Sequence, residues 1–351
     1  MAECINTFDY EQAAQAKIPE AFFGYYAGGA ADEITLRENR TVFNRIKLRP
    51  RVLTNVSLRA LATTILGHAT AMPMLIAPTA MAQLAHPAGE VAIAHAAKNA
   101  GIIQCLSTLS NASLEEVAAV GATNWFQVYV YKDRQITQRL VERATAAGYQ
   151  ALVLTVDVPV PGVRENILRT GLQLPPGLTL KNFAAFHTTQ AAAILPYVNA
   201  QFDPALTWDD LTWLRSLTPL PVWVKGILRG DDAKRALDCG VAGIIVSNHG
   251  GRQLDTAVTS IDALPEVVAA VGTHIDVLAD GGIRRGTDIV KALALGARAI
   301  LVGRPVLWGL AVAGQEGVEH VLAILQHELD TALALCGCAS VADIGPDLIV
   351  C

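Results

Sequence analysis

The chain has 351 residues, enough for one large barrel or two average domains. Hydrophobic residues make up 52% and charged residues only 17%, a balance that favours a domain built on a buried sheet. The formal net charge is −5 and no basic stripe is present, which argues against a nucleic-acid partner. A small anionic substrate remains allowed, provided that arginines gather locally.

Cysteine usage and the chain ends indicate the compartment. None of the six cysteines forms a C-x-x-C pair or is spaced with histidine as in a zinc site, so we expect reduced thiols and no metal. The sequence shows no signal peptide, no run of 18 apolar residues and no C-terminal Ser-Lys-Leu address. We therefore expect a cytoplasmic protein without a membrane segment.

Residues 1–70 differ from the rest and are predicted to form an N-terminal helical cap. One helix opens at Thr7, a second follows Pro19 and closes at Gly28 and Gly29, and a third covers residues 32–40.

From residue 71 onward, apolar strand-like runs alternate with amphipathic segments. The runs are continuously apolar, as expected for parallel strands that helices cover. A capping box at Ser113 begins one of the helical segments. Helices are predicted over residues 89–99, 113–120, 134–147 and 231–239. Strands are predicted over residues 74–77, 102–106, 125–129, 151–155, 222–225, 243–247, 275–279 and 299–302.

Eight such units predict a (β/α)8 TIM barrel over residues 71–351, which they fit better than an open doubly wound sheet. No linker divides the chain, so one domain is expected over residues 1–351. The long segment after the fourth strand holds no clear strand. A segment of this length is usually a lid or binding loop, and we predict an active-site loop over residues 158–207.

Polar side chains follow every predicted strand. In this fold the active site forms at the carboxyl ends of the strands, so these side chains would face one cavity. In strand order they are Pro78, Thr79 and Ala80; Ser107 and Thr108; Gln127 and Tyr129; Thr155 and Asp157; Lys225; Ser247 to Arg252; Asp280 to Gly286; and Gly303 with Arg304.

The last two strand ends predict a phosphate site. Glycines 281 and 282 let backbone N–H groups approach an anion, and Arg284 and Arg304 supply charge. The helix opening near Thr287 would add its N-terminal dipole. Neither a G-x-G-x-x-G motif nor a P-loop is present, so NAD on a Rossmann unit and ATP on a P-loop are disfavoured.

His249 is the best candidate for a general base, because a histidine near its ordinary pKa can take a proton at physiological pH. Asp157 could orient it and stabilise its cationic form. Lys225 allows two interpretations: a Schiff-base nucleophile, as in barrel aldolases, or a fixed cation beside an electron-accepting ring. The residues alone do not choose between them.

Together these residues resemble the FMN-dependent L-2-hydroxy acid oxidase family, which includes glycolate oxidases, lactate oxidases and flavocytochrome-type lactate dehydrogenases. The resemblance covers nearly the whole chain, and the run Ser-Asn-His-Gly-Gly-Arg-Gln that begins at Ser247 is highly specific. The other matching motifs lie at residues 25–30, 77–81, 127–129, 280–286 and 303–305.

The resemblance implies FMN as cofactor and assigns roles to the matching positions. His249 is similar to the catalytic base and Asp157 to its carboxylate partner, with Lys225 as the cation beside the flavin, which favours the electrostatic interpretation. The substrate would be held by Tyr25, Tyr129, Arg164 and Arg252. The flavin ring would lie against Pro78, Thr79, Ala80, Ser107, Gln127 and Thr155. The ribityl chain and phosphate would contact Ser247, Asp280, Gly282, Arg284, Gly303 and Arg304.

Within the family, three features narrow the choice. No haem-binding domain precedes the barrel, and the apolar piece at residues 191–196 is shorter than the anchor of membrane-bound members. Ala80 stands where dehydrogenases often have glycine. Members are commonly tetramers or octamers, so a homotetramer or octamer is expected.

The predicted reaction is oxidation of L-lactate to pyruvate with O2 reduced to H2O2. Leu109 replaces the tryptophan of plant glycolate oxidases and leaves room for the lactate methyl group. Met81 and Phe202 also resemble lactate oxidases of the cyanobacterial type. A glycolate oxidase, an oxidase of longer hydroxy acids and a Schiff-base aldolase using Lys225 remain alternatives.

Overall fold

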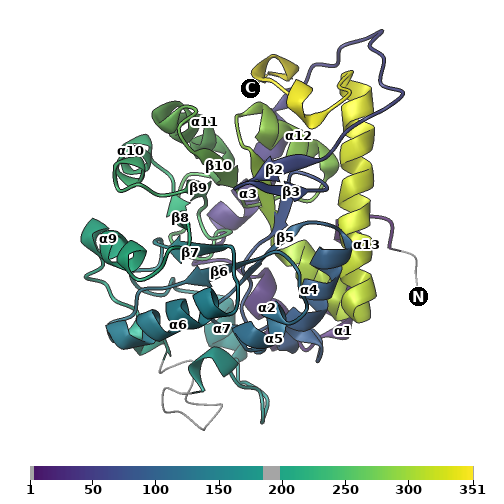
Figure 1. Cartoon of the computed structure of the whole chain (residues 1–351). Coiled ribbons are helices and arrows are strands. Elements are labelled where there is room, and N and C mark those ends of the chain that lie inside the picture. The colour runs from purple at the N-terminus through teal and green to yellow at the C-terminus, as the bar shows by residue number, and fades with distance from the viewer. Residues whose placement is uncertain (1–3, 185–197, 351) are drawn as a thin grey trace.

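The computed structural model describes residues 4–184 and 198–350 (Figure 1). The apolar piece at residues 191–196 therefore lies outside the described residues. Eight parallel strands form a closed barrel, in which each strand pairs with the next along the chain and β11 closes the ring against β4. The strands are β4 (Met74–Ile76), β5 (Ile103–Leu106), β6 (Asn124–Val128), β7 (Ala151–Thr155), β8 (Val222–Ile227), β9 (Gly243–Val246), β10 (Asp276–Ala279) and β11 (Ala299–Val302).

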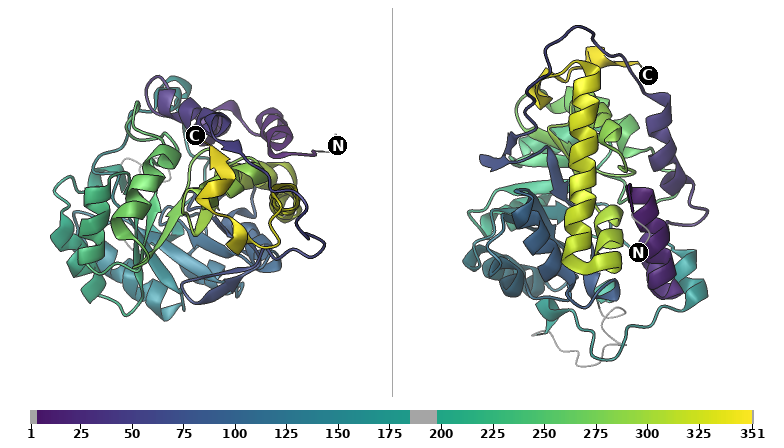
Figure 2. Two further views of the ribbon diagram at one scale, coloured as in Figure 1. Left: turned by 90° about the horizontal axis from the view of Figure 1, so that it is seen from above. Right: turned by 90° about the vertical axis from the view of Figure 1, so that its right-hand side faces the viewer.

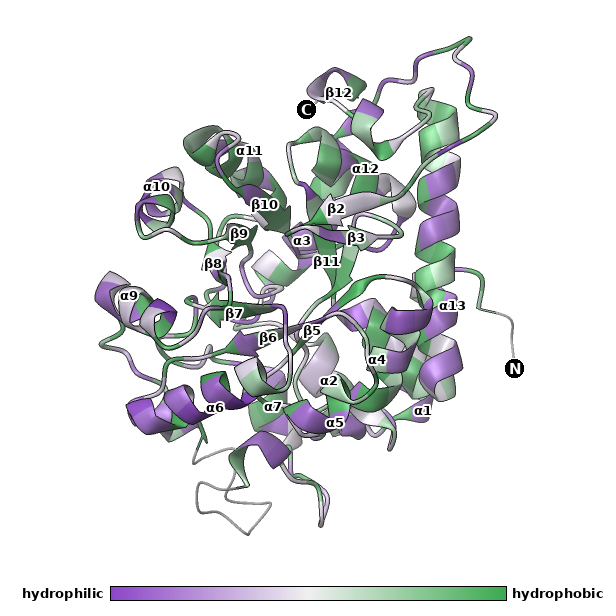
Figure 3. Ribbon diagram, viewed as in Figure 1, coloured by the Kyte–Doolittle hydropathy of each residue, from purple (hydrophilic) through white to green (hydrophobic). Residues whose placement is uncertain are grey.

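All eight predicted strands, and the barrel that they imply, are confirmed. Nearly every residue in them is buried, because helices cover the outside while side chains fill the inside. The covering helices are α4 (Gly89–Asn99), α5 (Leu114–Ala118), α6 (Arg134–Ala146), α9 (Trp208–Ser216), α10 (Gly230–Asp238), α11 (Ser260–Val271), α12 (Gly286–Ala294) and α13 (Arg304–Cys336). Figure 3 shows apolar strands inside and polar faces on outer helices such as α6.

The capping box predicted at Ser113 is present at the start of α5. The Ser113 hydroxyl accepts the N–H of Glu116, and the Glu116 carboxylate accepts the N–H of Ser113. The long helix α13 is kinked at Ala313 and Gly314 and stands along one side of the barrel (Figure 2).

The first 70 residues contain the three predicted helices, α1 (Thr7–Lys17), α2 (Glu20–Ala27) and α3 (Ile34–Arg45). Helix α1 packs along α13 (Figure 2). The segment also contains strands that the sequence did not predict: β1 (Lys47–Leu48), paired with β12 (Ile349–Val350), and the hairpin β2 (Thr63–Ile65) with β3 (His68–Thr70).

The hairpin closes the amino end of the barrel. Ile65 is fully buried against the inward-facing side chains of the strands, among them Leu75, Trp125 and Trp223. The two indole rings lie 4.9 Å apart between centroids and fill the barrel interior. The other end of the barrel is consequently the open one.

The segment between β7 and β8 contains a short helix, α7 (Glu165–Thr170), and a 3-10 turn, η2 (Lys181–Phe183), in its described part. Helix α7 packs against α2, which brings this segment onto the N-terminal helices. The remaining 3-10 turns are η1 (Ala82–Leu84), η3 (Val341–Asp343) and η4 (Pro346–Leu348). No helix in residues 4–184 or 198–350 combines the length and apolar character needed to cross a bilayer.

Packing inside the barrel requires glycine at residue 243. A Cβ atom there would lie 2.2 Å from Cζ3 of Trp223, so Gly243→Ala must displace the ring or the strand. Overpacking of this kind costs roughly 1–3 kcal/mol, and we expect a lower Tm in thermal unfolding of the holoenzyme.

The matched control is Gly24→Ala, within α2, where an added Cβ meets no atom within 4 Å. Alanine is favoured over glycine in a helix by roughly 0.5–1 kcal/mol, so this variant should be at least as stable as the parent. Equal Tm values for the two variants would contradict the packing argument.

Candidate active site

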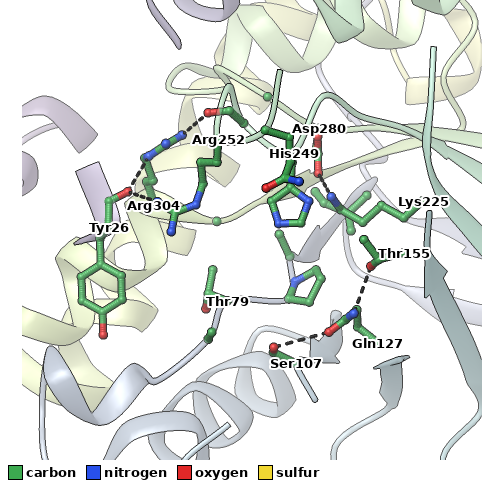
Figure 4. A pocket seen from close by; sticks show the side chains of 18 of the residues that line it. Tyr26, Thr79, Ser107, Gln127, Thr155, Lys225, His249, Arg252, Asp280 and Arg304 are labelled. Atoms are coloured by element: carbon green, nitrogen blue, oxygen red, sulfur yellow. Dashed lines mark hydrogen bonds and ion pairs between the residues drawn. The ribbon is translucent and has the colours of Figure 1, made fainter. Parts of the chain in front are cut away.

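One large cavity lies at the carboxyl end of the barrel, with about 1240 Å³ of empty space including its mouth. The ends of all eight barrel strands contribute to its wall, and residues from α2 and from the segment after β7 complete it (Figure 4). This is where a barrel is expected to bind its ligand.

The structure brings nearly all the predicted site residues to this cavity. Asp157 and Ser247 are the exceptions: they do not line it and lie directly behind His249 and Lys225. The predicted residues that line it are Tyr25, Pro78, Thr79, Ala80, Ser107, Leu109, Gln127, Tyr129, Thr155, Arg164, Lys225, His249, Arg252, Asp280, Gly282, Arg284, Gly303 and Arg304.

His249 is held in an orientation suited to a base. Its Nδ1 lies 2.9 Å from Oδ1 of Asp157, and its backbone N–H donates to the Ser247 hydroxyl at 3.0 Å. The backbone is left-handed at His249 (φ 58°), a conformation uncommon outside glycine and frequent at functional sites.

The charge states of this pair follow from their surroundings. Burial lowers the pKa of His249 below its ordinary 6.5, although the Asp157 carboxylate opposes the change. Burial would raise the pKa of Asp157, but the charge and hydrogen bond of His249 and the charge of Lys225 outweigh it, so that pKa is lowered. An ionised Asp157 accepts a hydrogen bond from Nδ1–H, which leaves the lone pair of a neutral imidazole on Nε2.

Lys225 is a buried cation with two acidic neighbours. Its Nζ lies 3.1 Å from Oδ2 of Asp280 and donates to the Ser247 hydroxyl at 2.8 Å (Figure 4). Burial would lower its pKa, but Asp280 and Asp157 raise it above its ordinary value. A Schiff-base nucleophile needs an unprotonated amine, so this environment argues against the aldolase alternative.

Arg252 and Arg164 both lie over the ring of Tyr25. Their guanidinium carbons lie 5.1 Å and 5.7 Å from the ring centroid, and they belong to the segments after β9 and β7 respectively. Burial and the neighbouring Arg164 lower the pKa of Arg252 to about 10. Two adjacent guanidinium groups of this kind form a site for a carboxylate.

Arg284 and Arg304 form a second cationic pair in the cavity wall, and Arg304 lies beside Arg252. Burial, Arg252 and Arg284 lower the pKa of Arg304 to about 9, and burial also lowers that of Arg284. Within residues 4–184 and 198–350, no carboxylate forms an ion pair with any of these four arginines. All four guanidinium groups therefore remain available to anionic groups of a ligand.

The carboxyl end of α2 holds two of the arginines in place. Arg252 donates to the carbonyls of Tyr25, Tyr26 and Gly28 at 2.6, 3.3 and 3.3 Å. Arg304 donates to those of Tyr26 and Gly28 at 2.8 and 3.1 Å. The last carbonyls of a helix lack partners inside it and carry partial negative charge, so they suit guanidinium groups.

The helix near Thr287, predicted to add its N-terminal dipole to a phosphate site, is α12. The N–H groups before α12 are already occupied: those of Arg284 and Arg285 donate to Asp288, and that of Gly286 donates to Glu328. The free helix end at this site belongs to α13, which begins after Gly303 without a side-chain cap. Its N-terminus supplies the dipole expected at a phosphate site.

A chain of side-chain hydrogen bonds crosses the cavity floor. The amide of Gln127 donates to Thr155 at 3.0 Å and accepts from the Ser107 hydroxyl at 3.4 Å and from the Thr108 N–H at 3.1 Å (Figure 4). The three side chains come from consecutive strands, so they form one continuous polar face.

Sequence reasoning missed Tyr26 and Gln253, which also line the cavity. The Tyr26 hydroxyl donates to the Met81 carbonyl at 2.5 Å, and the Tyr26 carbonyl accepts from Arg252 and Arg304. Both residues lie inside motifs that carry the family resemblance, next to Tyr25 and Arg252. Their position beside these predicted site residues could have identified them from the sequence.

Comparisons with known proteins agree with this site. The model of the FMN-dependent dehydrogenase family matches residues 14–351. The chain is 57% identical to an L-lactate oxidase from Nostoc sp., covering 97% of this chain and 96% of that protein. It is 48% identical to glycolate oxidase 1 of Oryza sativa subsp. japonica, with 98% and 95% covered. A mandelate oxidase variant with (S)-mandelic acid superposes with a TM-score of 0.90 at 45% identity, covering 97% and 96%.

The chain therefore belongs to the FMN-dependent dehydrogenase family. Within that family it is an FMN-dependent 2-hydroxy acid oxidase.

The residues of the cavity fit FMN. Arg284, Arg304 and the open end of α13 could hold its phosphate. Oδ1 of Asp280 is buried without a hydrogen-bond partner in the described structure and could accept from a ribityl hydroxyl. The polar face of Gln127 lies within the same cavity and offers hydrogen bonds to a flat polar ring.

Proposed function

We propose that this enzyme oxidises L-lactate to pyruvate and reduces O2 to H2O2. The observation on which this rests is one cavity that combines a neutral, oriented imidazole, a pair of arginines without acidic partners, and a wall with leucine at residue 109. The 57% identity to an L-lactate oxidase supports it.

The substrate carboxylate binds between Arg164 and Arg252, with the Tyr25 hydroxyl as a further donor. Guanidinium groups fix the plane of a carboxylate, and so they orient the neighbouring α-carbon. The bound carboxylate also supplies the counter-ion that Arg164 and Arg252 lack within the protein.

His249 acts as the base, and its Nε2 accepts a proton from the substrate. Asp157 keeps the imidazole oriented and stabilises the imidazolium that forms. Bound FMN would supply the acceptor for the two electrons of the oxidation, with O2 as the final oxidant. Lys225 holds a positive charge at the cavity floor, where it stabilises negative charge that develops during the transfer.

We assign Tyr129 to a hydrogen bond with the substrate hydroxyl, because it lines the same cavity. Burial raises its pKa, so the phenol stays protonated and can donate a hydrogen bond. Its ring packs edge-on against Phe202, at 4.9 Å between centroids.

The wall around Leu109 favours a substrate with a small apolar side chain. Leu109 and Phe202 both line the cavity. Met81 does not: it is fully buried, and its N–H donates to the carbonyl of Leu109 at 3.0 Å. Met81 therefore influences the pocket through the position of Leu109. The homotetramer or octamer and the cytoplasmic location stay predictions.

A substrate panel with peroxide detection tests the proposed substrate. L-lactate should exceed glycolate in kcat/KM by about 10- to 200-fold, because one methyl group in an apolar pocket is worth roughly 1–3 kcal/mol. Leu109→Trp should reduce this ratio by filling the methyl site. D-lactate should be inactive. A higher kcat/KM for glycolate or for 2-hydroxyoctanoate would contradict the proposal of L-lactate as the preferred substrate.

His249→Gln tests the base. Glutamine keeps a polar side chain but cannot accept the proton, so kcat should fall by about 10²- to 10⁴-fold while the protein still binds FMN. His95→Gln, at an exposed position on α4, is the control and should be fully active. Steady-state turnover and visible flavin absorbance measure the two effects, and unchanged turnover in His249→Gln would reject the assignment.

The pH profile tests the protonation state of the pair. Because burial lowers the pKa of His249, the active neutral form should persist below pH 6.5. The kcat/KM value should then fall about tenfold per pH unit below that lowered pKa. Asp157 raises the pKa of His249, so Asp157→Asn should move this acid limb to lower pH, besides reducing turnover. An acid limb above pH 6.5 would contradict a neutral His249 beside an ionised Asp157.

A further inference from the structure

The proposed mechanism uses two residue pairs, His249 with Asp157 and Arg252 with Arg164. Each pair has one member in each of the same two loops. Asp157 and Arg164 lie in the segment after β7, whereas His249 and Arg252 lie in the loop after β9. The relative position of these loops therefore sets both the contact between imidazole and carboxylate and the spacing of the two guanidinium groups.

Gln253, next to Arg252, bridges the loops with one side-chain amide. Its Nε2 donates to the carbonyls of Asp157 and Val160 at 3.0 and 3.1 Å. Its Oε1 accepts the N–H of Gly162 at 3.2 Å. The amide thus holds residues 157–162 at three points, and its donors and acceptor all meet complementary backbone groups.

Gly162 shows independently that the loops are in direct contact. A Cβ atom at this position would lie 2.4 Å from the carbonyl oxygen of Arg252 and 2.7 Å from Cα of Gln253. No side chain fits between the two backbones, so only glycine permits this approach. Arg164 follows two residues later along the same segment.

The N-terminal segment binds both loops from a further side. The N–H of Ala30 donates to the carbonyl of Gly251 at 2.8 Å, and that of Ala31 donates to Val163 at 2.9 Å. The loops are therefore fixed to the cap as well as to each other, but the hydrogen bonds of Gln253 are the ones that reach Asp157.

We propose that Gln253 is a positioning residue, which holds the segment after β7 against the loop after β9 and so sets the geometry of the His249–Asp157 and Arg252–Arg164 pairs. The inference rests on the proposed function of these four residues. It assigns Gln253 an effect on substrate binding and on proton transfer without contact with the reacting atoms.

Gln253→Met in the holoenzyme removes the three hydrogen bonds and nearly keeps the side-chain volume. We expect a higher KM for L-lactate and a kcat/KM reduced by ~10- to 100-fold, since small misplacements of positioning groups have effects of this size. The acid limb of the pH profile should move lower, because a looser Asp157 raises the pKa of His249 less. Bound FMN should be unchanged.

Gln315→Met is the matched control, since that half-buried glutamine on α13 makes its hydrogen bond to Glu319. It should leave KM and the pH profile unaltered. A merely unstable Gln253→Met enzyme would lose active protein without a change in KM or in the acid limb, and that result would overturn the proposal.

A double variant with Arg164→Met distinguishes positioning from direct contact. If Gln253 acts through Arg164, the loss in kcat/KM of the double variant should stay well below the product of the single losses. If the loss of the double variant equals the product of the single losses, the positioning role of Gln253 is rejected, whereas the proposed carboxylate site is not. If Arg164→Met leaves KM unchanged, the proposed carboxylate site fails and the positioning role with it.

Gly162→Ala provides the same test with Gln253 intact. The added Cβ must push the segment after β7 away from Arg252, so KM should rise in the same manner. An unaltered KM in this variant would contradict control by the loop contact.

Discussion

Positive charge without a carboxylate partner is the constraint on which the rest of this structure depends. Four half-buried guanidinium groups line one cavity, and withdrawing each ion from water costs free energy unless hydrogen bonds and opposite charge offset it. The carboxyl end of α2 offsets part of this cost for Arg252 and Arg304 with backbone carbonyls. The part of the cost that these carbonyls do not offset can be offset by anionic ligands. Binding of a phosphate and a carboxylate should therefore stabilise the fold.

The N-terminal helices consequently belong to the active site. Helix α2 supplies carbonyls to Arg252 and Arg304, and the ring of its Tyr25 lies near Arg252 and Arg164. Helix α3 contributes Asn39, whose amide exchanges two hydrogen bonds with that of Asn248, next to His249. The barrel positions the strand ends, and the helices fix the loops that extend beyond them.

Charge alternates along the deepest part of the site. The imidazole of His249 adjoins Asp157, Lys225 feels both Asp157 and Asp280, and one oxygen of each carboxylate is left without a partner among the described residues. This order keeps Asp157 ionised, Lys225 protonated and the imidazole of His249 neutral. The same order separates an oxidase from an aldolase, because it removes the nucleophile that an aldolase needs while it retains a base.

The sequence predicted the features that local patterns encode. Continuous apolar runs gave the eight strands, and their ends gave most of the cavity wall, since strand ends of a barrel meet at one face. The hairpin at Ile65 was not predicted because its strands are three residues long, and pairing partners decide such short elements. The acceptor of the Gly286 N–H at the amino end of α12 could not be predicted, because Glu328 lies 42 residues away along the chain.

The positions of Ser247 and Asp157 behind the wall were equally invisible in the sequence. A strand-end residue can point into the cavity or support its neighbour, and only packing decides which. Ser247 accepts hydrogen bonds from His249 and Lys225, so it supports both. Gln253 shows the reverse: its hydrogen bonds run to backbone groups more than 90 residues away, and no local pattern indicates them.

Substrate choice is physically separate from the chemistry, but only in part. Charged groups on the loops hold the carboxylate and the reacting carbon, whereas apolar contacts at Leu109 and Phe202 face the side chain of the substrate. Such contacts discriminate by only about 1–3 kcal/mol per methyl group, so relatives named for lactate, glycolate and mandelate can share one charged framework. However, Phe202 packs against Tyr129, and Leu109 accepts a hydrogen bond from Met81. A change in the wall therefore also moves a residue beside the substrate hydroxyl, and specificity and turnover should change together.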